Sequence, residues 1–548
     1  MKVRSCVMVL VAVVVVTACS QKVKDDGYAP SPMSPPRASP LPPPPPMARM
    51  APAPSLNAIV MTGSLAVPGA NTEVYERPAD NPVKRTTEQP VSTFSVDVDT
   101  GSYSNVRRML ESGVRPPADA VRAEEFINYF DYNYAVPADK ATPFRVHTEL
   151  ANAPWDKRKQ VMMIGIKGYE QAQASLPPMN LVFLIDTSGS MYSDDKLPLL
   201  KRAFAQLVPQ LRKQDRVAIV AYAGSAGLVL EPTSGDQRGK ILAALEQLQA
   251  GGSTNGGAGI ELAYAMAAQS FIEGGANRVI LATDGDFNVG IADRGALETL
   301  VGDRRKSGIA LTTLGFGTGN YNDAMAERLA DVGNGNHAYI DSLSEARRVL
   351  VREMGSTLFT IASDVKIQVE FNPARVSEYR LIGYENRVLN NEDFANDKVD
   401  AGDIGPGHEV TALYEIVPVG SGAEQLPALR YGDTPAAAKD HGNEVAEVRL
   451  RYKLPGQDQS ALITRPILAS SLQATPSESL RFASAVAGFA DALRGGQRMP
   501  GWSWEQILAT AREARGDDPE GERAQFIQLV STGQALIEPD ATVSGARN

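Results

Sequence analysis

Cysteine and histidine are scarce in this chain. Among its 548 residues there are two cysteines, Cys6 and Cys19, and both lie at the extreme N-terminus. Nothing downstream can form a disulfide, a thiolate metal site or a cysteine nucleophile, so hydrophobic cores have to hold the fold together. The four histidines stand singly in unlike contexts, and we expect them to be surface or satisfied core residues: His147, His337, His408 and His441.

An excess of basic residues is also missing. The formal net charge is −10, whereas domains that bind nucleic acids are usually basic, with clustered Lys and Arg. The charge therefore argues against a nucleic-acid partner and agrees weakly with cation binding. Hydrophobic residues make up 43% and charged residues 22%, as in ordinary globular proteins. The length predicts roughly two to four domains.

The N-terminal hydrophobic run is too short to span a bilayer comfortably. Residues 7–16 are apolar without interruption, and Lys2 and Arg4 precede them. A spanning helix needs about 20 apolar residues, whereas the hydrophobic part of a signal peptide is shorter. The pattern predicts a signal peptide over residues 1–18.

Small residues lead up to Cys19, and the sequence Val16-Thr17-Ala18-Cys19 resembles a bacterial lipobox. The resemblance implies cleavage before Cys19, lipidation of its thiol and a lipid-anchored place in the bacterial cell envelope. Ser20 follows the cysteine, which resembles the default for outer-membrane sorting in a Gram-negative host and disfavours the inner membrane. A plain secretory signal with a coincidental cysteine is the alternative.

Residues 19–90 are predicted to be a lipidated, Pro-rich tether. Residues 30–54 are dominated by Pro, Ala, Ser and Met, and residues 42–46 are consecutive prolines. Such a segment cannot bury enough apolar surface to offset its ordering entropy, so it stays disordered and favours extended polyproline II. At about 3.1 Å per residue, it would hold the folded part away from the membrane.

Three folded regions follow the tether. Residues 91–175 predict an N-terminal α+β extension, residues 178–358 a domain of alternating strands and helices, and residues 362–548 a C-terminal region that is β-rich and then helical. The sequence leaves open whether the strands of residues 144–167 join the C-terminal strands in one sandwich.

Continuous apolar strands identify the middle region as α/β. Strands buried on both faces indicate a mainly parallel, doubly wound sheet with helices on each side. The strands are predicted at residues 181–185, 216–222, 278–282, 310–316 and 337–340. The helices are predicted at residues 197–211, 237–248, 259–271, 294–304, 323–330 and 344–354.

Short oxygen-bearing side chains gather where these strands end. Asp186, Ser188 and Ser190 follow the first strand, Thr254 lies in a Gly-rich loop, and Asp284 follows the strand of residues 278–282. Because ligands bind at the carboxyl ends of strands in open α/β sheets, these loops can converge on one edge. Hydroxyl and carboxylate oxygens select Mg²⁺, with Ca²⁺ or Mn²⁺ as further candidates, over zinc or copper. Two carboxylates at most compensate the charge of such an ion, so an Asp or Glu of a protein partner is the natural last ligand.

The five positions Asp186, Ser188, Ser190, Thr254 and Asp284 resemble the metal-ion-dependent adhesion site of von Willebrand factor A domains. The resemblance extends to residues 92–100, 125–130 and 281–288, which look like a bacterial group of envelope proteins of the YfbK type. That group is implied to have an N-terminal extension, the A domain and a C-terminal domain of undefined function. The resemblance implies a metal-dependent protein binder for adhesion, scaffolding or assembly.

Other functions explain the sequence less well. A haloacid-dehalogenase-like phosphatase needs a second aspartate two residues after the first, and that position is Ser188. No Walker loop is present, and no Gly-x-Ser-x-Gly elbow occurs at a strand end. We therefore expect no enzyme and no catalytic residues. A structural envelope protein whose A domain does not use metal is the alternative, and a metal-dependent hydrolase is a remote one. Asp97 and Asp99 could hold a cation, but we expect one of them to face solvent and the next to cap a helix.

Overall fold

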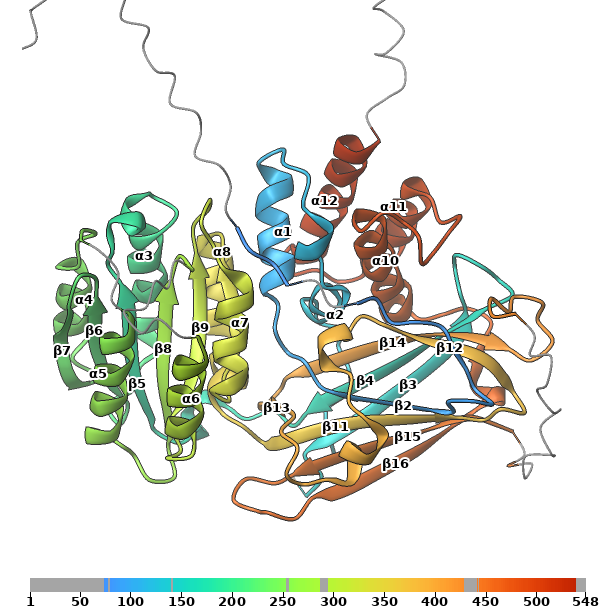
Figure 1. The fold of residues 1–548 in the computed structure, drawn as a ribbon, viewed down its shortest axis with the longest axis horizontal. Coiled ribbons are helices and arrows are strands. Elements are labelled where there is room, and N and C mark those ends of the chain that lie inside the picture. The colour runs from blue at the N-terminus through green and yellow to red at the C-terminus, as the bar shows by residue number, and fades with distance from the viewer. Residues whose placement is uncertain are drawn as a thin grey trace, which may run out of the picture. The chain divides into compact units, whose positions relative to one another are not determined.

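The protein is described from a computed structural model (Figure 1). The structure describes residues 73–76, 79–138, 141–252, 256–285, 294–427, 441 and 443–538. The predicted signal peptide, Cys19 and most of the predicted tether lie outside these ranges. The predicted end of the tether at residue 90 is wrong, because Lys84 and Arg85 form a strand paired with Tyr379 and Glu378. Within them, no helix is long and apolar enough to cross a membrane.

The central region folds around a sheet ordered β10-β9-β8-β5-β6-β7 (Figure 1). Every neighbouring pair is parallel except β6 and β7, which are antiparallel. This order confirms the doubly wound, mainly parallel α/β fold. The strands are β5 (Met179–Asp186), β6 (Arg216–Tyr222), β7 (Ala226–Ser234), β8 (Ala276–Thr283), β9 (Ala310–Phe316) and β10 (His337–Ile340). We call the part from β5 to α9 the central domain.

The sequence pattern does not predict the edge strand β7. Gly227 and Pro232 interrupt its apolar pattern, and both residue types are depleted in strands. A proline is tolerated on an edge strand because one side of that strand makes no ladder hydrogen bonds.

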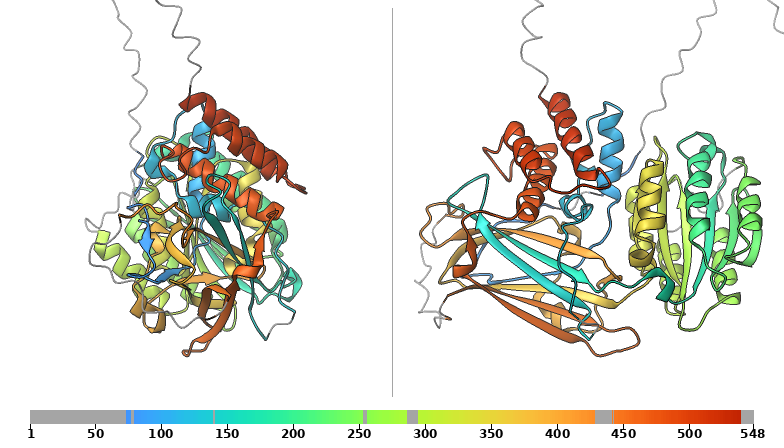
Figure 2. Two further views of the ribbon diagram at one scale, coloured as in Figure 1. Left: turned by 90° about the vertical axis from the view of Figure 1, so that its right-hand side faces the viewer. Right: turned by 180° about the vertical axis from the view of Figure 1, so that it is seen from behind.

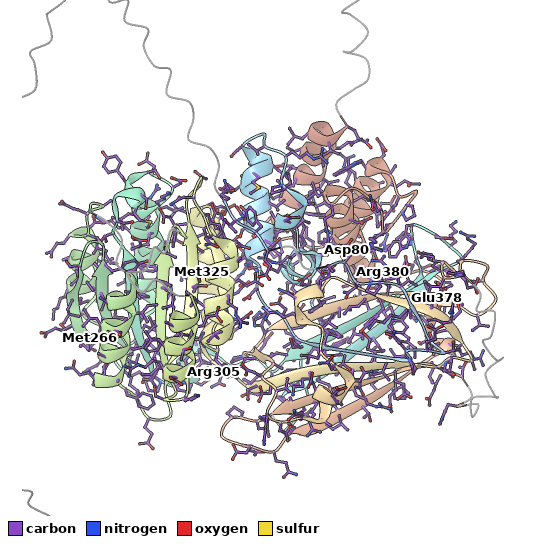
Figure 3. The ribbon with its side chains drawn as sticks, viewed as in Figure 1. Asp80, Met266, Arg305, Met325, Glu378 and Arg380 are labelled. Atoms are coloured by element: carbon purple, nitrogen blue, oxygen red, sulfur yellow. The ribbon has the colours of Figure 1, made fainter. Side chains whose placement is uncertain are left out.

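Helices cover both faces of the central sheet. Leu181, Phe183 and Ile185 of β5 pack with α3, α4 and α8 on one face. Val182 and Leu184 point to the other face, where they pack with α5, α6 and α7. Met266 and Met325 mark α5 and α7 on that second face in Figure 3. The helices are α3 (Leu197–Leu207), α4 (Arg238–Glu246), α5 (Gly256–Gln269), α6 (Arg294–Arg305), α7 (Asp323–Val332), α8 (Leu343–Arg347) and α9 (Met354–Leu358).

The last helix of the central domain is broken. The sequence predicts one helix over residues 344–354, but a π-helical turn, η5 (Arg348–Arg352), separates α8 from α9. A π-turn shifts the register of side chains along a helix. Here Arg348 lies at the start of that turn, with its guanidinium 4.0 Å from the centroid of the Tyr129 ring.

Strands that precede and strands that follow the central domain in the sequence together form two further sheets. One has the order β1-β12-β14-β4-β3-β17, and the other has the order β13-β11-β15-β16 with β2 also paired to β11. Figure 2 shows β3 and β4 from behind, beside the later strands. The strands are β1 (Lys84–Arg85), β2 (Val91–Ser95), β3 (Phe144–Asn152), β4 (Gln160–Gly168), β11 (Ala362–Phe371), β12 (Val376–Ile382), β13 (Gly402–Ile404), β14 (Glu409–Pro418), β15 (Glu444–Lys453), β16 (Ala461–Leu468) and β17 (Leu472–Gln473).

These two sheets share one core, to which Phe94, Ile164, Ile367 and Tyr414 contribute. β4 lies next to β14 in the first sheet, and β2 lies next to β11 in the second. The question that the sequence left open is therefore settled: the early and late strands form one sandwich, and the central domain is inserted between β4 and β11.

A helical layer packs against the outer face of the first sheet. Its core joins aromatic residues of the helices, such as Phe126 and Phe489, to Val161 and Met163 of β4. The helices are α1 (Gly101–Glu111), α2 (Ala123–Asn128), α10 (Glu478–Leu493), α11 (Trp504–Glu513) and α12 (Glu522–Ile537). Short 3-10 turns are η1 (Ala118–Ala120), η2 (Gln173–Ser175), η3 (Gly189–Tyr192), η4 (Val208–Gln210), η6 (Glu385–Arg387), η7 (Asn391–Ala395) and η8 (Ala469–Ser471). We call the sandwich and this layer together the flanking domain.

Two capping signals in the sequence predict helix starts in the flanking domain, one at Thr475 before Pro476 and Glu478, and one at Ser503 to Gln506. Ser503 caps α11 and forms a reciprocal capping box with Gln506, as the sequence predicts. For α10 the predicted cap, Thr475, is wrong. Ser477 is the cap, and its hydroxyl accepts a hydrogen bond from the backbone N–H of Leu480. Two adjacent hydroxyl residues flank Pro476, and the pattern alone does not distinguish them.

Buried charges join the central domain to the flanking domain. Arg107 of α1 donates to both carboxylate oxygens of Asp341, at 2.6 and 2.7 Å, and to Glu345 of α8 at 2.8 Å. Its remaining terminal nitrogen donates to the Tyr129 hydroxyl at 2.6 Å. All three ionised side chains are almost completely buried.

Asp99 also takes part in the contact between the two domains, and its predicted role as a helix cap is wrong. Thr100 is the cap residue of α1, without a side-chain cap bond. Asp99 is buried and instead accepts a hydrogen bond from the backbone N–H of His337 on β10, at 2.8 Å. Arg387 forms ion pairs with both Asp97 and Asp99. Asp97 is therefore buried as well, because an arginine from a distant part of the chain supplies the countercharge.

Replacing Arg107 tests how strongly the buried ion pairs between the two domains stabilise the fold. Arg107→Met leaves Asp341 and Glu345 buried without one of their cationic partners, which costs about 3–5 kcal/mol. We expect the urea midpoint of the full chain to fall accordingly. Arg158→Met is the matched control, because Arg158 is 61% exposed in its pair with Asp156 and exposed ion pairs contribute little to stability. Equal shifts in the two variants would contradict the prediction.

Candidate functional site

The turn that follows β5 is pinned by backbone hydrogen bonds from two neighbouring segments. The N–H of Thr187 donates to the carbonyl of Tyr222 at the end of β6, at 2.9 Å. The N–H of Gly189 donates to the carbonyl of Gly252 at 3.0 Å, and the N–H of Gly251 donates to the carbonyl of Thr187 at 2.8 Å. A Cβ at Gly189 would already touch the Gly252 carbonyl. The three hydrogen bonds therefore fix the turn against the end of β6 and against the loop of Gly251 and Gly252.

Asp186 is the buried centre of this turn. One carboxylate oxygen accepts the N–H of Ser188 at 2.8 Å, and the other accepts the hydroxyls of Tyr222 and Thr283 at 3.2 Å each. Burial raises the pKa of Asp186 to about 6, and the charge of Asp284 adds to the rise, whereas its hydrogen bonds oppose it. Three donors thus only partly replace the water that burial removes.

The two serines of the turn present their hydroxyls together. The Oγ atoms of Ser188 and Ser190 are 2.9 Å apart. Ser188 is buried, whereas Ser190 is exposed. Because both hydroxyls retain lone pairs beyond their mutual hydrogen bond, they can face a shared cation at the surface.

Asp284 follows β8, the parallel neighbour of β5, and it is completely buried. One of its carboxylate oxygens accepts hydrogen bonds from Lys196 Nζ at 2.9 Å and from the Asn320 side-chain amide at 3.2 Å. The Lys196 ammonium also donates to the Asn320 carbonyl oxygen at 2.8 Å. The sequence reasoning missed Lys196 and Asn320, because neither lies in a motif and only the folded loops bring them to Asp284.

The structure brings four of the five predicted residues to the carboxyl edge of the sheet: Asp186, Ser188, Ser190 and Asp284. Thr254 lies outside the described residues, as does Cys19. Tyr222 and Thr283 hold Asp186 and were also missed. Thr283 precedes Asp284 directly and could have been identified as a hydroxyl donor from that position.

The donor set fits a hard divalent cation. All side-chain donors are hydroxyl or carboxylate oxygens, which Mg²⁺ and Ca²⁺ prefer. No cluster of three or more His, Cys, Asp or Glu side chains suited to a metal exists within the described ranges. A cation at this edge would therefore depend on the serine hydroxyls, and it would relieve the cost of an ionised, buried Asp186.

The expectation of surface or satisfied core histidines holds for His337 and is wrong for His408, whose buried Nδ1 has no hydrogen-bond partner among the described residues. His337 is buried, and its two ring nitrogens hydrogen-bond the hydroxyls of Thr313 at 3.0 Å and Tyr321 at 2.9 Å. This confirms that His337 is a satisfied core residue. Ser188, at the position where the phosphatase comparison requires an aspartate, bonds Ser190 and cannot serve as that acid.

Comparison with known sequences agrees with this architecture. The profile of the von Willebrand factor type A domain matches residues 180–353. A second profile, described as von Willebrand factor, matches residues 69–163, and the profile of the C-terminal part of the uncharacterized protein YfbK matches residues 356–536. The central domain is thus a von Willebrand factor type A domain, a class that commonly mediates interactions between proteins.

The chain belongs to the YfbK family. It is 49% identical to the uncharacterized protein YfbK of Escherichia coli K12 over 481 residues, which cover 86% of this chain and 83% of that protein. It is 26% identical to the uncharacterized protein sll0103 of Synechocystis over 328 residues, 58% of this chain and 71% of that protein. A solved von Willebrand factor type A protein from Catenulispora acidiphila matches with 16% identity and a TM-score of 0.42, covering 76% of this chain and 93% of that one.

The raised pKa of Asp186 predicts how its neutral variant behaves without metal. The folded state raises this pKa from 3.8 to about 6. The folded protein therefore binds the proton more tightly than the unfolded chain, and ionisation destabilises the fold. In EDTA, we expect Asp186→Asn to be up to about 2–3 kcal/mol more stable than wild type above pH 6. The difference should vanish below about pH 4.

Urea unfolding of the full chain across this pH range measures the difference. Asp194→Asn is the control, because it makes the same substitution at an exposed aspartate of the same loop. A pH-independent difference for Asp186→Asn would contradict the electrostatic explanation.

Proposed function

We propose that the carboxyl edge of the central sheet is a metal-ion-dependent adhesion site. Its ligands would be Asp186, Ser188, Ser190, Thr254 and Asp284, directly or through water, and its ion would be Mg²⁺, with Ca²⁺ or Mn²⁺ as alternatives. The observation that supports this most is the pair of serine hydroxyls, 2.9 Å apart, on a turn whose aspartate is buried.

The ligand of this site would be a carboxylate of a protein partner. Two carboxylates at most neutralise a divalent ion, and hydroxyl ligands add no charge. The ion would therefore retain affinity for an anionic oxygen. An Asp or Glu on a partner supplies one without a covalent change, so the proposed function is binding and not catalysis.

An exposed aromatic side chain supports a protein ligand. Tyr192 ends the turn η3 that begins at Gly189, and its side chain is 81% exposed. Tyrosines contribute strongly to protein interfaces because a large, rigid ring is buried there at low entropic cost. We propose that Tyr192 packs against the partner beside the metal-bound carboxylate.

The proposed site would be presented from the envelope by a lipid anchor. We propose a signal peptide over residues 1–18, lipidation at Cys19 and a Pro-rich tether that ends before residue 73, with an outer-membrane location facing the periplasm or the surface. The sequence Val16-Thr17-Ala18-Cys19 and the Pro-rich composition that follows it support this. The role would be adhesion, scaffolding or assembly at the envelope.

Calorimetric titration with Mg²⁺ tests the metal site. We expect wild type to bind one Mg²⁺ and Asp186→Ala to lose measurable binding, because the principal charged ligand is removed. Ser190→Ala should bind about tenfold more weakly or worse, the scale on which single ligand contacts act at metal sites. The matched controls are Asp194→Ala and Ser193→Ala, which change the same residue types on the same loop. Equal binding by Asp186→Ala and wild type would refute the assignment.

A pull-down from envelope extract with and without EDTA tests the proposed grip on a partner. We expect the specific partners of wild type to be lost in EDTA and in Asp186→Ala. With Tyr192→Ala, capture should weaken while Mg²⁺ affinity stays unchanged, because the ring contacts the partner and not the ion. Recovery of the same partners in EDTA would reject metal-mediated binding, and unchanged capture by Tyr192→Ala would reject the role of the ring.

A further inference from the structure

We propose that Lys196 is a built-in counter-ion of the metal site, which weakens metal binding and keeps the loaded site positively charged for a carboxylate ligand. The inference rests on the proposed function and specifies how the same site is regulated. It assigns a role to a residue outside the five-residue motif.

Lys196 is buried, and its ammonium contacts a proposed metal ligand. Only 6% of the residue is exposed, which is unusual for lysine. Its ammonium lies 2.9 Å from a carboxylate oxygen of Asp284 and 2.8 Å from the side-chain carbonyl of Asn320. The charge of this lysine is thus held against a proposed metal ligand and does not reach solvent.

The rest of the side chain is enclosed as well. Gly317 has a φ of +77°, and a Cβ at this position would overlap the Cγ, Cδ and Cε atoms of Lys196. The carbonyl of Gly317 accepts a hydrogen bond from the Tyr339 hydroxyl at 2.6 Å, which fixes the backbone over the lysine stem. Lysine usually extends its ammonium into water. Here a glycine in a left-handed conformation makes room for the stem, so the buried position is part of the fold.

The formal charges at the site show how Lys196 would change the net charge of the metal-loaded site. Asp186 and Asp284 carry one negative charge each, and Lys196 returns one positive charge, so the site has a net charge of −1 before a metal binds. A divalent ion changes this to +1, whereas the same site without the lysine would become neutral. With Lys196, a partner carboxylate would approach a metal-loaded site of charge +1. Without Lys196, it would approach a neutral site, to which the electrostatic attraction is weaker.

Two further carboxylates lie near this loop, and each accepts hydrogen bonds from groups other than the Lys196 ammonium. Glu73 accepts the N–H of Gly319 but is paired with Arg108. Asp195 is half-buried, and it accepts hydrogen bonds from Ser193 and from Thr318. Lys196 is the ammonium that directly contacts a proposed ligand, as the bonds within the described residues show.

Two neutral replacements separate charge from positioning. Lys196→Met keeps the length of the side chain but has neither the charge nor an N–H donor. Lys196→Gln keeps an N–H donor for Asp284 without the charge. If Lys196 acts through its charge, both variants of the full-length protein should bind Mg²⁺ about tenfold more tightly or better, because a cation a few ångströms from the ion is removed. Lys201→Met on α3 is the matched control, since its ammonium contacts the Glu246 carbonyl instead and should leave the affinity unchanged.

Acetate serves as the carboxylate probe in the same titrations. We expect acetate to increase the apparent Mg²⁺ affinity of wild type and to increase that of the two neutral variants much less. Thermal unfolding confirms that each variant is folded before titration.

The outcomes distinguish this inference from the proposed function. Weaker Mg²⁺ binding by Lys196→Met that Lys196→Gln restores would show that the lysine only positions Asp284, and it would overturn the inference. Unchanged affinity in both variants would overturn it too. Failure of wild type to bind Mg²⁺ would overturn the proposed function itself, and the inference with it.

Discussion

A carboxylate buried at the end of a central strand is the constraint on which the candidate site depends. Removing the carboxylate of Asp186 from water is costly unless donors or a cation replace the lost hydration. Here the Ser188 N–H and the hydroxyls of Tyr222 and Thr283 supply three donors. They come from the turn itself, from β6 and from β8, so the order of the sheet has to be correct before Asp186 can be buried. The pKa of about 6 shows that these donors do not fully compensate.

The insertion of the central domain depends on a second set of buried charges. The chain leaves the sandwich after β4 and returns to it at β11, and these crossings alone would leave the central domain free to rotate. Arg107, Arg122 and Arg387 each reach acidic side chains of the central domain: Asp341, Asp323 and Asp331. Ion pairs excluded from water are directional and are costly to break singly. They therefore fix the orientation of the inserted domain where its apolar surface alone would not.

Much of the fold could be predicted from the sequence, because burial on two faces leaves a clear pattern. The apolar run that becomes β5 predicts both its parallel sheet and the position of Asp186 at its end. β7 escaped prediction because an edge strand has neither continuous burial nor strict alternation, and the break at Arg348 escaped because residues 344–354 keep a helical pattern. The sandwich could not be predicted, since the pairing of β4 with β14 joins segments about 250 residues apart.

Some residues of the candidate site could likewise be predicted from the sequence, and others could not. Asp186, Ser188 and Ser190 are close in sequence, and Asp284 follows a recognisable strand, so local pattern and strand order suffice for them. Lys196 and Asn320 follow no such rule, because their roles arise from side-chain contacts between loops. Asp99 shows the opposite error: a local capping pattern was available, but burial against β10 gave its carboxylate a better donor in the His337 N–H.

The loop that carries Asn320 connects these two sets of constraints. Its Tyr321 carbonyl accepts the N–H of Val74, and its Gly319 N–H donates to Glu73, which is paired with Arg108 of α1. Asn320 in turn contacts both Lys196 and Asp284. Residues 73–74 near the end of the predicted tether, the first helix of the flanking domain and the proposed metal ligand therefore share one loop. Because each contact restricts the same few backbone torsions, the position of Asp284 depends on the docking of the flanking domain as well as on the central sheet. An isolated central domain would lose the contacts of Val74 and Glu73 on either side of Asn320, so the geometry of this edge depends on more of the chain than the central sheet.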